Sequence, residues 1–141
     1  MEEVSRFVLA PGIYRRDDGA ILRARMNRAK SSLYTEQWVR NRDTFEFAYR
    51  PDAIGTLRNA QRLSLLEARE ISRQVGQCLA CAALLTDLKS QMAGLGPTCE
   101  KNWSQPQPRW FRVVIKKTPF GTQIDTYPIR TIVPPPSLAV V

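Results

Sequence analysis

The chain has 141 residues, and its 21 Lys and Arg residues against 13 Asp and Glu residues give a formal net charge of +8. It contains no histidine, which excludes Ser-His and Cys-His catalytic pairs, histidine metal ligands and imidazole acid–base chemistry. The hydrophobic share of 43% is that of a globular protein. We expect one compact domain with a modest core, because ten prolines interrupt the apolar segments.

The positive charge favours a polyanionic partner, either nucleic acid or the acidic face of another protein. A basic surface that only keeps the protein in solution is the alternative. No run approaches the roughly 18 apolar residues of a membrane span. Residues 1–6 also lack the basic and then apolar layout of a secretory signal. We therefore expect a cytoplasmic protein whose cysteines stay reduced.

The N-terminal part, residues 1–60, is predicted to be a β-rich basic region. Runs at 13–16 and 21–26 flank Asp17-Asp18-Gly19, which is typical of a hairpin turn because Gly19 can adopt a positive φ. Further strands are predicted at 32–39 and 44–49. In the second of these, aromatic residues recur at every second position, as in a strand with one buried face.

The middle part, residues 61–104, begins with a capped helix. Ser64 and Glu67 form a capping box, in which each side chain can accept a hydrogen bond from the other residue's main-chain N–H. Apolar residues then recur on one helical face as far as Gly76, which predicts a helix over 64–75. A second, short helix is predicted near 87–93.

Three cysteines in this part are spaced as metal ligands. Cys78 and Cys81 form a Cys-x-x-Cys turn just after the predicted helix, and Cys99 follows a Gly-x-Gly-Pro loop. Such a turn holds two thiolates at the separation that one tetrahedral Zn²⁺ accepts, and a distant third thiolate closes the site. We predict a structural zinc ion. The alternative is that the cysteines are small buried hydrophobic residues.

A structural zinc ion needs a fourth ligand, and the chain has neither a fourth cysteine nor a histidine. A carboxylate, a water molecule or a residue of a partner chain can fill this position. Asp87 and Glu100 are the nearest carboxylates in the sequence, and Asp87 is preferred. Because Asp87 stands at the start of the predicted short helix, the competing interpretation is an N-cap.

Four segments of the middle part form a distinctive pattern: Leu-Ser-Leu-Leu-Glu-Ala at 63–68, Gly-Gln-Cys-Leu-Ala-Cys at 76–81, Leu-Thr-Asp-Leu-Lys-Ser at 85–90 and Gly-Leu-Gly-Pro-Thr-Cys at 94–99. With them, residues 63–103 resemble a family of unknown function found mainly in bacteriophages and actinobacteria. The resemblance implies zinc binding by three cysteines and a phage or mobile-element origin. The family's Gly-Arg after the second cysteine is Ala82-Ala83 here, which predicts a weaker site.

The remaining parts are a C-terminal hairpin at 105–133 and an extended tail at 134–141. The hairpin consists of a strand at 110–117 and a partner at 123–133, and the proline-rich tail cannot build a core. The fold class is thus predicted as α+β, with a small antiparallel sheet, one capped helix, a cysteine knuckle with a short helix, and this hairpin. The sequence leaves open whether the N-terminal and C-terminal strands share one sheet.

Two basic stretches are predicted to contact nucleic acid. The first is the arginine-rich hairpin, with Arg15, Arg16, Arg23 and Arg25. Two of these arginines share a strand face that can lie along phosphates. The second is the C-terminal strand, with Arg109, Trp110, Arg112, Lys116 and Lys117. Cations beside an aromatic residue are typical of single-strand binding, although a solvated face and a packed tryptophan are the alternatives.

The predicted function is that of a small, zinc-stapled, non-enzymatic accessory protein that binds nucleic acid. No catalytic residue is predicted, because no base stands ready to activate a cysteine and the Gly-rich loop lacks the Lys-Ser/Thr of a phosphate loop. The alternative is a phage-encoded interaction module. Such a module would dock on a host protein with an acidic face in the host cytoplasm, and its zinc would be purely structural.

Overall fold

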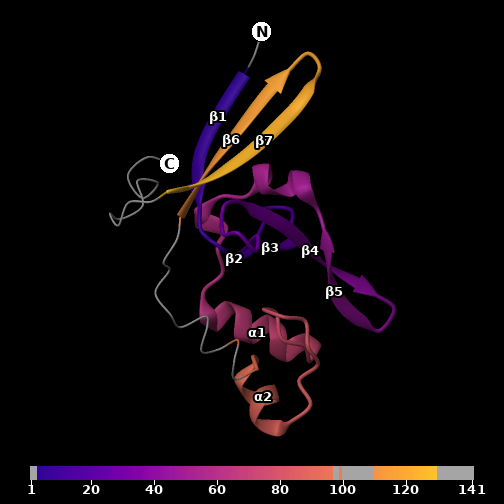
Figure 1. Cartoon of the computed structure of the whole chain (residues 1–141). Helices are drawn as coiled ribbons and strands as arrows, with labels where there is room; N and C mark the ends of the chain where they lie inside the picture. The colour runs from indigo at the N-terminus through magenta and orange to yellow at the C-terminus, as the bar shows by residue number, and fades with distance from the viewer. Residues whose placement is uncertain (1–2, 97–98, 100–109, 130–141) are drawn as a thin grey trace.

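The computed structural model describes residues 3–96, 99 and 110–129. Within this part of the chain, two antiparallel sheets are combined with two short α-helices, an α+β arrangement (Figure 1). The start of the predicted C-terminal part, residues 105–109, and the predicted tail at 134–141 lie outside the described residues. No helix in the described part is long and apolar enough to cross a membrane.

The larger sheet has four strands in the order β2-β3-β4-β5. Its strands are β2 (Gly12–Arg15), β3 (Ile21–Met26), β4 (Leu33–Asn41) and β5 (Thr44–Tyr49). Each strand pairs with the next along the chain, so the sheet is a meander of hairpins. The turn between β2 and β3 contains Gly19 with a φ of 89°. The predicted first hairpin and the strand at 44–49 are confirmed.

The smaller sheet has three strands in the order β1-β6-β7. They are β1 (Glu3–Leu9), β6 (Trp110–Thr118) and β7 (Gly121–Ile129). β6 lies in the centre, and Phe7 of β1 pairs with Val113 of β6 across the ladder. The first strand of the chain therefore shares a sheet with the C-terminal hairpin, while residues 12–49 form a sheet of their own. The sequence had left this question open.

The main core joins the two sheets. It includes Tyr14 and Leu22 from the four-stranded sheet and Phe111 and Val113 from β6, all of them fully buried. Ile54 joins the same cluster from the first of two 3₁₀ helices, which are η1 (Pro51–Thr56) and η2 (Asn59–Gln61). Burying one such apolar side chain contributes about 1.5–3 kcal/mol. The two sheets are thus held together by shared apolar packing.

The first helix, α1 (Leu65–Val75), has the capping box that the sequence indicates. The Glu67 N–H donates to Ser64 Oγ at 3.1 Å, and the Ser64 N–H donates to the Glu67 carboxylate at 2.9 Å. Gly76 ends the helix in the left-handed conformation, with a φ of 73°. The observed range differs by one residue from the predicted 64–75.

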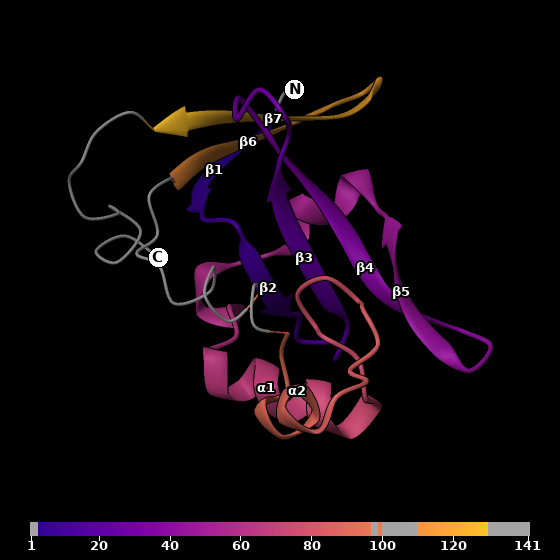
Figure 2. The same ribbon diagram turned by 60° about the horizontal axis from the view of Figure 1, so that its bottom comes forward.

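The second helix, α2 (Leu88–Ala93), is short and packs against the first. It ends at Gly94, whose φ is 81°. A Cβ at this glycine would lie 2.4 Å from the main-chain oxygen of Arg69 in α1, so only glycine permits the close approach of the two helices. Figures 1 and 2 show both helices at the end of the molecule opposite the β1-β6-β7 sheet.

Candidate metal site

Three thiol groups come together just beyond the end of α1. The sulfur atoms of Cys78, Cys81 and Cys99 all lie within 4.8 Å of one another. Zinc–sulfur bonds of about 2.3 Å in a tetrahedron place sulfurs about 3.8 Å apart, so small side-chain shifts bring all three onto one ion. Cys78 is buried, Cys99 is half-buried and Cys81 is exposed. The predicted cluster of three cysteines is therefore present, and it can hold a metal ion.

The cysteine knuckle, residues 76–85, is a tight turn closed by main-chain hydrogen bonds. The Cys78 N–H donates to Ala83 O at 2.8 Å, and the Ala82 N–H donates to Cys78 O at 2.7 Å. Ala82 has a φ of 67°, in the left-handed region, where an alanine costs about 1–2 kcal/mol relative to glycine. The chain thus forms the turn with a strained residue.

Buried side chains attach this knuckle to the sheet and to the helix. The Phe45 N–H in β5 donates to Gln77 Oε1 at 2.8 Å, and Gln77 Nε2 donates to Phe45 O at 2.9 Å. The Leu79 N–H donates to the buried Ser72 hydroxyl of α1 at 2.9 Å. These bonds use protein atoms alone, so the fold itself positions the turn that carries the first two thiols.

Arg23, predicted to contact phosphates, instead contacts this knuckle and its own sheet. Its guanidinium donates to the Glu36 carboxylate at 2.8 and 3.1 Å and to Ala80 O, and it lies 3.8 Å over the Phe47 ring. Only 13% of its side chain is exposed. The reason is the β3–β4 register, which sets Glu36 directly opposite Arg23. Arg25 keeps half its side chain exposed, with a Glu36 oxygen at 3.7 Å.

Cys78 and Cys99 have pKa values shifted in opposite directions. Burial raises the pKa of Cys78, but hydrogen bonds to its sulfur, including one from the Gly96 N–H, together hold that pKa below its usual range. Burial, hydrogen bonds to the other two sulfurs and the nearby Cys78 charge raise the pKa of Cys99 to about 12. Cys78 is therefore more readily ionised than Cys99. A bound dication supplies the positive charge that lets all three ionise.

Asp87, the preferred fourth ligand, does not join the cysteines. Its carboxylate accepts a hydrogen bond from the Ser90 N–H at 3.0 Å and caps α2, and this bond holds the pKa of Asp87 below its usual range. Among the described residues, the group of metal-ligating atoms contains sulfur alone. The prediction for Asp87 is corrected accordingly, because a side chain directed at the first turn of a helix is committed to the main chain. Glu100 lies outside the described residues.

The other residues predicted to bind nucleic acid are distributed over both sheets. Arg16 pairs with Asp18 at 2.8 Å in the first hairpin turn, next to the exposed Arg15. On β6, Arg112 and Lys117 are exposed, while Trp110 and Lys116 are half-buried, and Arg109 lies outside the described residues. The structure thus leaves the two predicted basic stretches on different sheets.

The solvent side of the β1-β6-β7 sheet, here called the outer face, carries cations and aromatic residues together: Arg6, Trp110, Arg112, Lys116 and Tyr127. The alternate residues of β6, among them Phe111, are buried in the core, so those of the outer face point the other way. Tyr127 stands directly opposite Arg112 and is 52% exposed. The sequence analysis missed Arg6 and Tyr127, since only the register across the ladders places them beside β6.

The chain matches no protein-family profile, no curated protein sequence and no solved structure. Its function is therefore inferred from the arrangement of its own residues.

Proposed function

We propose that the protein is a zinc-stapled, non-enzymatic, basic accessory protein that binds single-stranded nucleic acid through the outer face. The observation that carries this proposal is the pairing of exposed cations with aromatic side chains on one face of the β1-β6-β7 sheet, around the buried Val8 and Val114. Arg112 and Tyr127 are direct cross-strand neighbours there, and Trp110 lies two residues along the same strand. The proposal covers DNA and RNA alike.

The chemistry of this surface suits an unpaired strand. An aromatic ring stacks on a base of any identity, and each such contact is worth about 1–3 kcal/mol. A guanidinium or ammonium group beside the ring pairs with the phosphate of the same nucleotide and releases counterions. The strands of a sheet hold these groups at fixed spacings, which reduces the entropy lost on binding.

In this proposal the zinc ion has a structural role. Three thiolates of Cys78, Cys81 and Cys99 would hold it, and it would close a loop of about twenty residues that contains α2 and begins just after α1. A small domain with a modest core gains stability from such a closure. We assign the fourth position to water or to a partner residue, since none of the described carboxylates lies with the sulfurs.

A protein-interaction module remains the second candidate because apolar side chains are exposed near the helices. Leu66 of α1 and Leu88 and Met92 of α2 are each more than 60% exposed. Exposed apolar residues that cluster on one part of a surface are typical of docking sites. Under this proposal the partner would be a host protein, with the cysteine knuckle as scaffold.

Titration of fluorescently labelled 20-mers of dT and rU at several salt concentrations tests the first candidate. We expect the affinity to fall steeply as the salt concentration rises. Tyr127→Ala should lower the affinity about 5- to 100-fold. Arg112→Gln should make the slope of log affinity against log salt concentration shallower by about 0.7. Tyr49→Ala and Arg42→Gln change exposed residues of the other sheet and serve as matched controls. If the variants and the controls lose nucleic-acid affinity equally, the outer face is not the binding surface, and the interaction module becomes the favoured candidate.

A further inference from the structure

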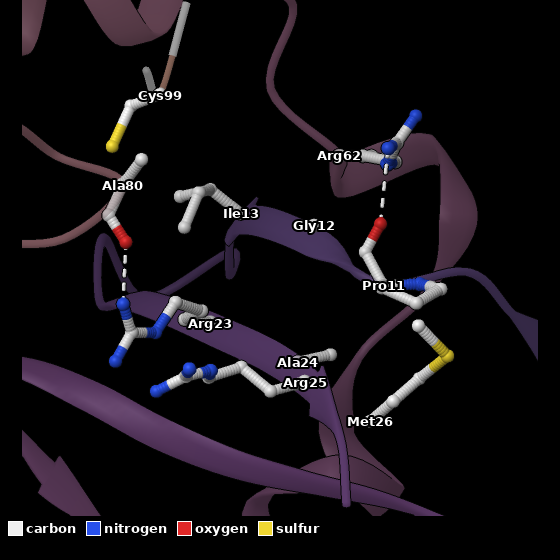
Figure 3. Close-up of a pocket in the computed structure, with 10 residues that line it drawn as sticks. All are labelled: Pro11, Gly12, Ile13, Arg23, Ala24, Arg25, Met26, Arg62, Ala80 and Cys99. Carbon is white, nitrogen blue, oxygen red and sulfur yellow. Dashed lines mark hydrogen bonds between the residues drawn. The ribbon is translucent and has the colours of Figure 1, made fainter. Parts of the chain in front are cut away.

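A pocket of about 400 Å³ lies between the first hairpin and the cysteine knuckle (Figure 3). Three arginines line it, namely Arg23, Arg25 and Arg62, and none of the described carboxylates does. Figure 3 shows Arg62 on one side of the β2 main chain and the two β3 arginines on the other. We call it the arginine pocket. Its volume is in the range of small-ligand sites.

The charges around this pocket do not balance. Arg23 and Arg25 share the single carboxylate of Glu36. Arg62 donates from Nη2 to Pro11 O at 3.0 Å, but its Nε is buried and finds no hydrogen-bond partner in the described part of the chain. No carboxylate of the described residues forms an ion pair with Arg62. Arg23 and Arg25 thus share one carboxylate, whereas Arg62 pairs with none of the described ones and keeps a buried donor unused, which is an arrangement that an anion completes.

The seat of Arg62 is built into the fold. The residue forms a β-bridge with Tyr14 of β2, which fixes its main chain beside the hairpin. A Cβ on Gly12 would lie 2.5 Å from Arg62 Nε, so a side chain at position 12 would displace the guanidinium. The glycine therefore makes room for this cation at the pocket, and chance exposure of a flexible arginine does not explain its position.

The rest of the lining is apolar and includes Ile13, Ala24 and Met26. A pocket of cations and apolar side chains suits a ligand with an anionic group on a planar or apolar body. Arginine binds phosphate through charge-assisted hydrogen bonds, and aliphatic side chains and methionine pack against aromatic rings. The combination selects a phosphate ester of an aromatic nucleoside over a bare anion.

We propose that the arginine pocket binds one nucleoside monophosphate unit, with its phosphate on Arg62 and its base against the apolar lining. The unit can be a free nucleotide or the 5′-phosphorylated end of a strand. The second source rests on the proposed nucleic-acid function, whereas the first stands without it. Ala80 and Cys99 also line the pocket, so the bound unit would lie next to the candidate metal site.

Isothermal titration with AMP and with inorganic phosphate tests the free source, and labelled dT 20-mers with and without a 5′-phosphate test the strand end. We expect AMP to bind more tightly than phosphate, and Arg62→Gln to weaken AMP or 5′-phosphate binding roughly 10- to 100-fold. Arg62→Lys keeps the positive charge but lacks the planar guanidinium group, so it should retain only part of the AMP or 5′-phosphate affinity. Arg28→Gln removes an exposed arginine elsewhere and should change nothing.

Thermal unfolding checks that each variant is folded. If Arg62→Gln does not fold, Arg25→Gln takes its place, since the Arg25 side chain is half-exposed. AMP binding that survives Tyr127→Ala supports the pocket even if the outer face fails. Strands that bind without regard to a 5′-phosphate, together with no saturable AMP binding, would overturn the pocket and leave the outer face standing. Equal AMP binding by Arg62→Gln and the unchanged protein would also overturn it.

Discussion

The cysteine knuckle and the outer face are the two regions to which we assign function, and they are assembled in opposite ways. The knuckle places Cys78 and Cys81 by a local turn, which contacts at Phe45 and Ser72 hold in position. The outer face joins residues more than a hundred positions apart, because β1 pairs with β6. A short loop can therefore specify ligand spacing by itself, whereas a binding surface on a sheet depends on strand register.

Cysteine substitution gives the largest expected effect and shows whether the two regions are independent. Cys78→Ser removes a thiol at a fully buried position, and we expect the zinc content to fall from about one ion per chain to near zero. The loss of stability should exceed about 4 kcal/mol, since structural zinc sites can contribute about 10–16 kcal/mol in peptides. Elemental mass spectrometry and thermal unfolding measure both quantities.

Leu84→Ser, at an exposed position of the same knuckle, is the control for Cys78→Ser. It should leave the zinc content unchanged. If the purified unchanged protein carries no zinc and Cys78→Ser loses only the stability of a core residue, then the cysteines are packing residues. The cysteine knuckle would then be a packed turn without a metal ion, and only the outer face would keep an assigned function.

Glycine substitutions test how tightly α1 and α2 must approach beside the knuckle. Gly94→Ala introduces both a left-handed alanine and a contact of 2.4 Å with main-chain oxygen, so we expect destabilisation by about 3 kcal/mol. Gly76→Ala carries the same backbone strain in open space and should cost about 1 kcal/mol. Gly96→Ala meets neither obstacle and should stay within about 0.5 kcal/mol. Urea unfolding of the three variants gives this order, and a different order would contradict the helix packing.

Alkaline unfolding tests the core that joins the two sheets. Burial of Tyr14 raises its pKa from 10.0 to about 12, despite the positive charge of Arg62. Because the unfolded chain ionises first, the contribution of Tyr14 is complete below about pH 10 and is lost as the pH rises through about 12, for a total of about 2–3 kcal/mol. The free energy of unfolding, measured in urea at several pH values, should lose this pH dependence in Tyr14→Phe and keep it in Tyr49→Phe.

The smallest expected effect concerns the strained residue of the knuckle. Ala82→Gly relieves a positive φ of 67°, so it should stabilise the protein by about 1 kcal/mol and tighten zinc binding about fivefold. Ala83→Gly is the matched control, because its φ is not positive, and it should be neutral or slightly destabilising. Competition with a zinc chelator measures the affinities. A tighter site in both variants would contradict the role given to residue 82.

Local sequence patterns predicted the parts of the fold that depend on neighbouring residues. The capping box at Ser64, the stop at Gly76 and the turn at Gly19 all appear where the sequence indicates them. The spacing of the three cysteines likewise indicated the group that the structure brings together. Each of these features is decided within one turn or one short loop, where residue type and backbone conformation are directly linked.

Local patterns did not predict how side chains would be used across long distances. The alternation of residues in β3 predicts that Arg23 is exposed. In the structure it pairs with Glu36 of the next strand and contacts Ala80 of the knuckle. Asp87 is close to the cysteines in the sequence and was therefore preferred as the fourth zinc ligand, but its carboxylate caps the N-terminus of α2. Arg62 gave no signal at all, because its importance depends on the glycine across from it.

The sequence by itself determined the two hairpins, the two α-helices, the cysteine spacing and the excess of positive charge. Tertiary structure alone decided that β1 joins β6 and that Tyr127 stands beside Arg112. It also left Arg62 without a counterion among the described residues while Arg23 gained one. The physical reason is that capping, turn geometry and periodicity act over a few residues, whereas strand register and ion pairing depend on which surfaces the collapsed chain brings together.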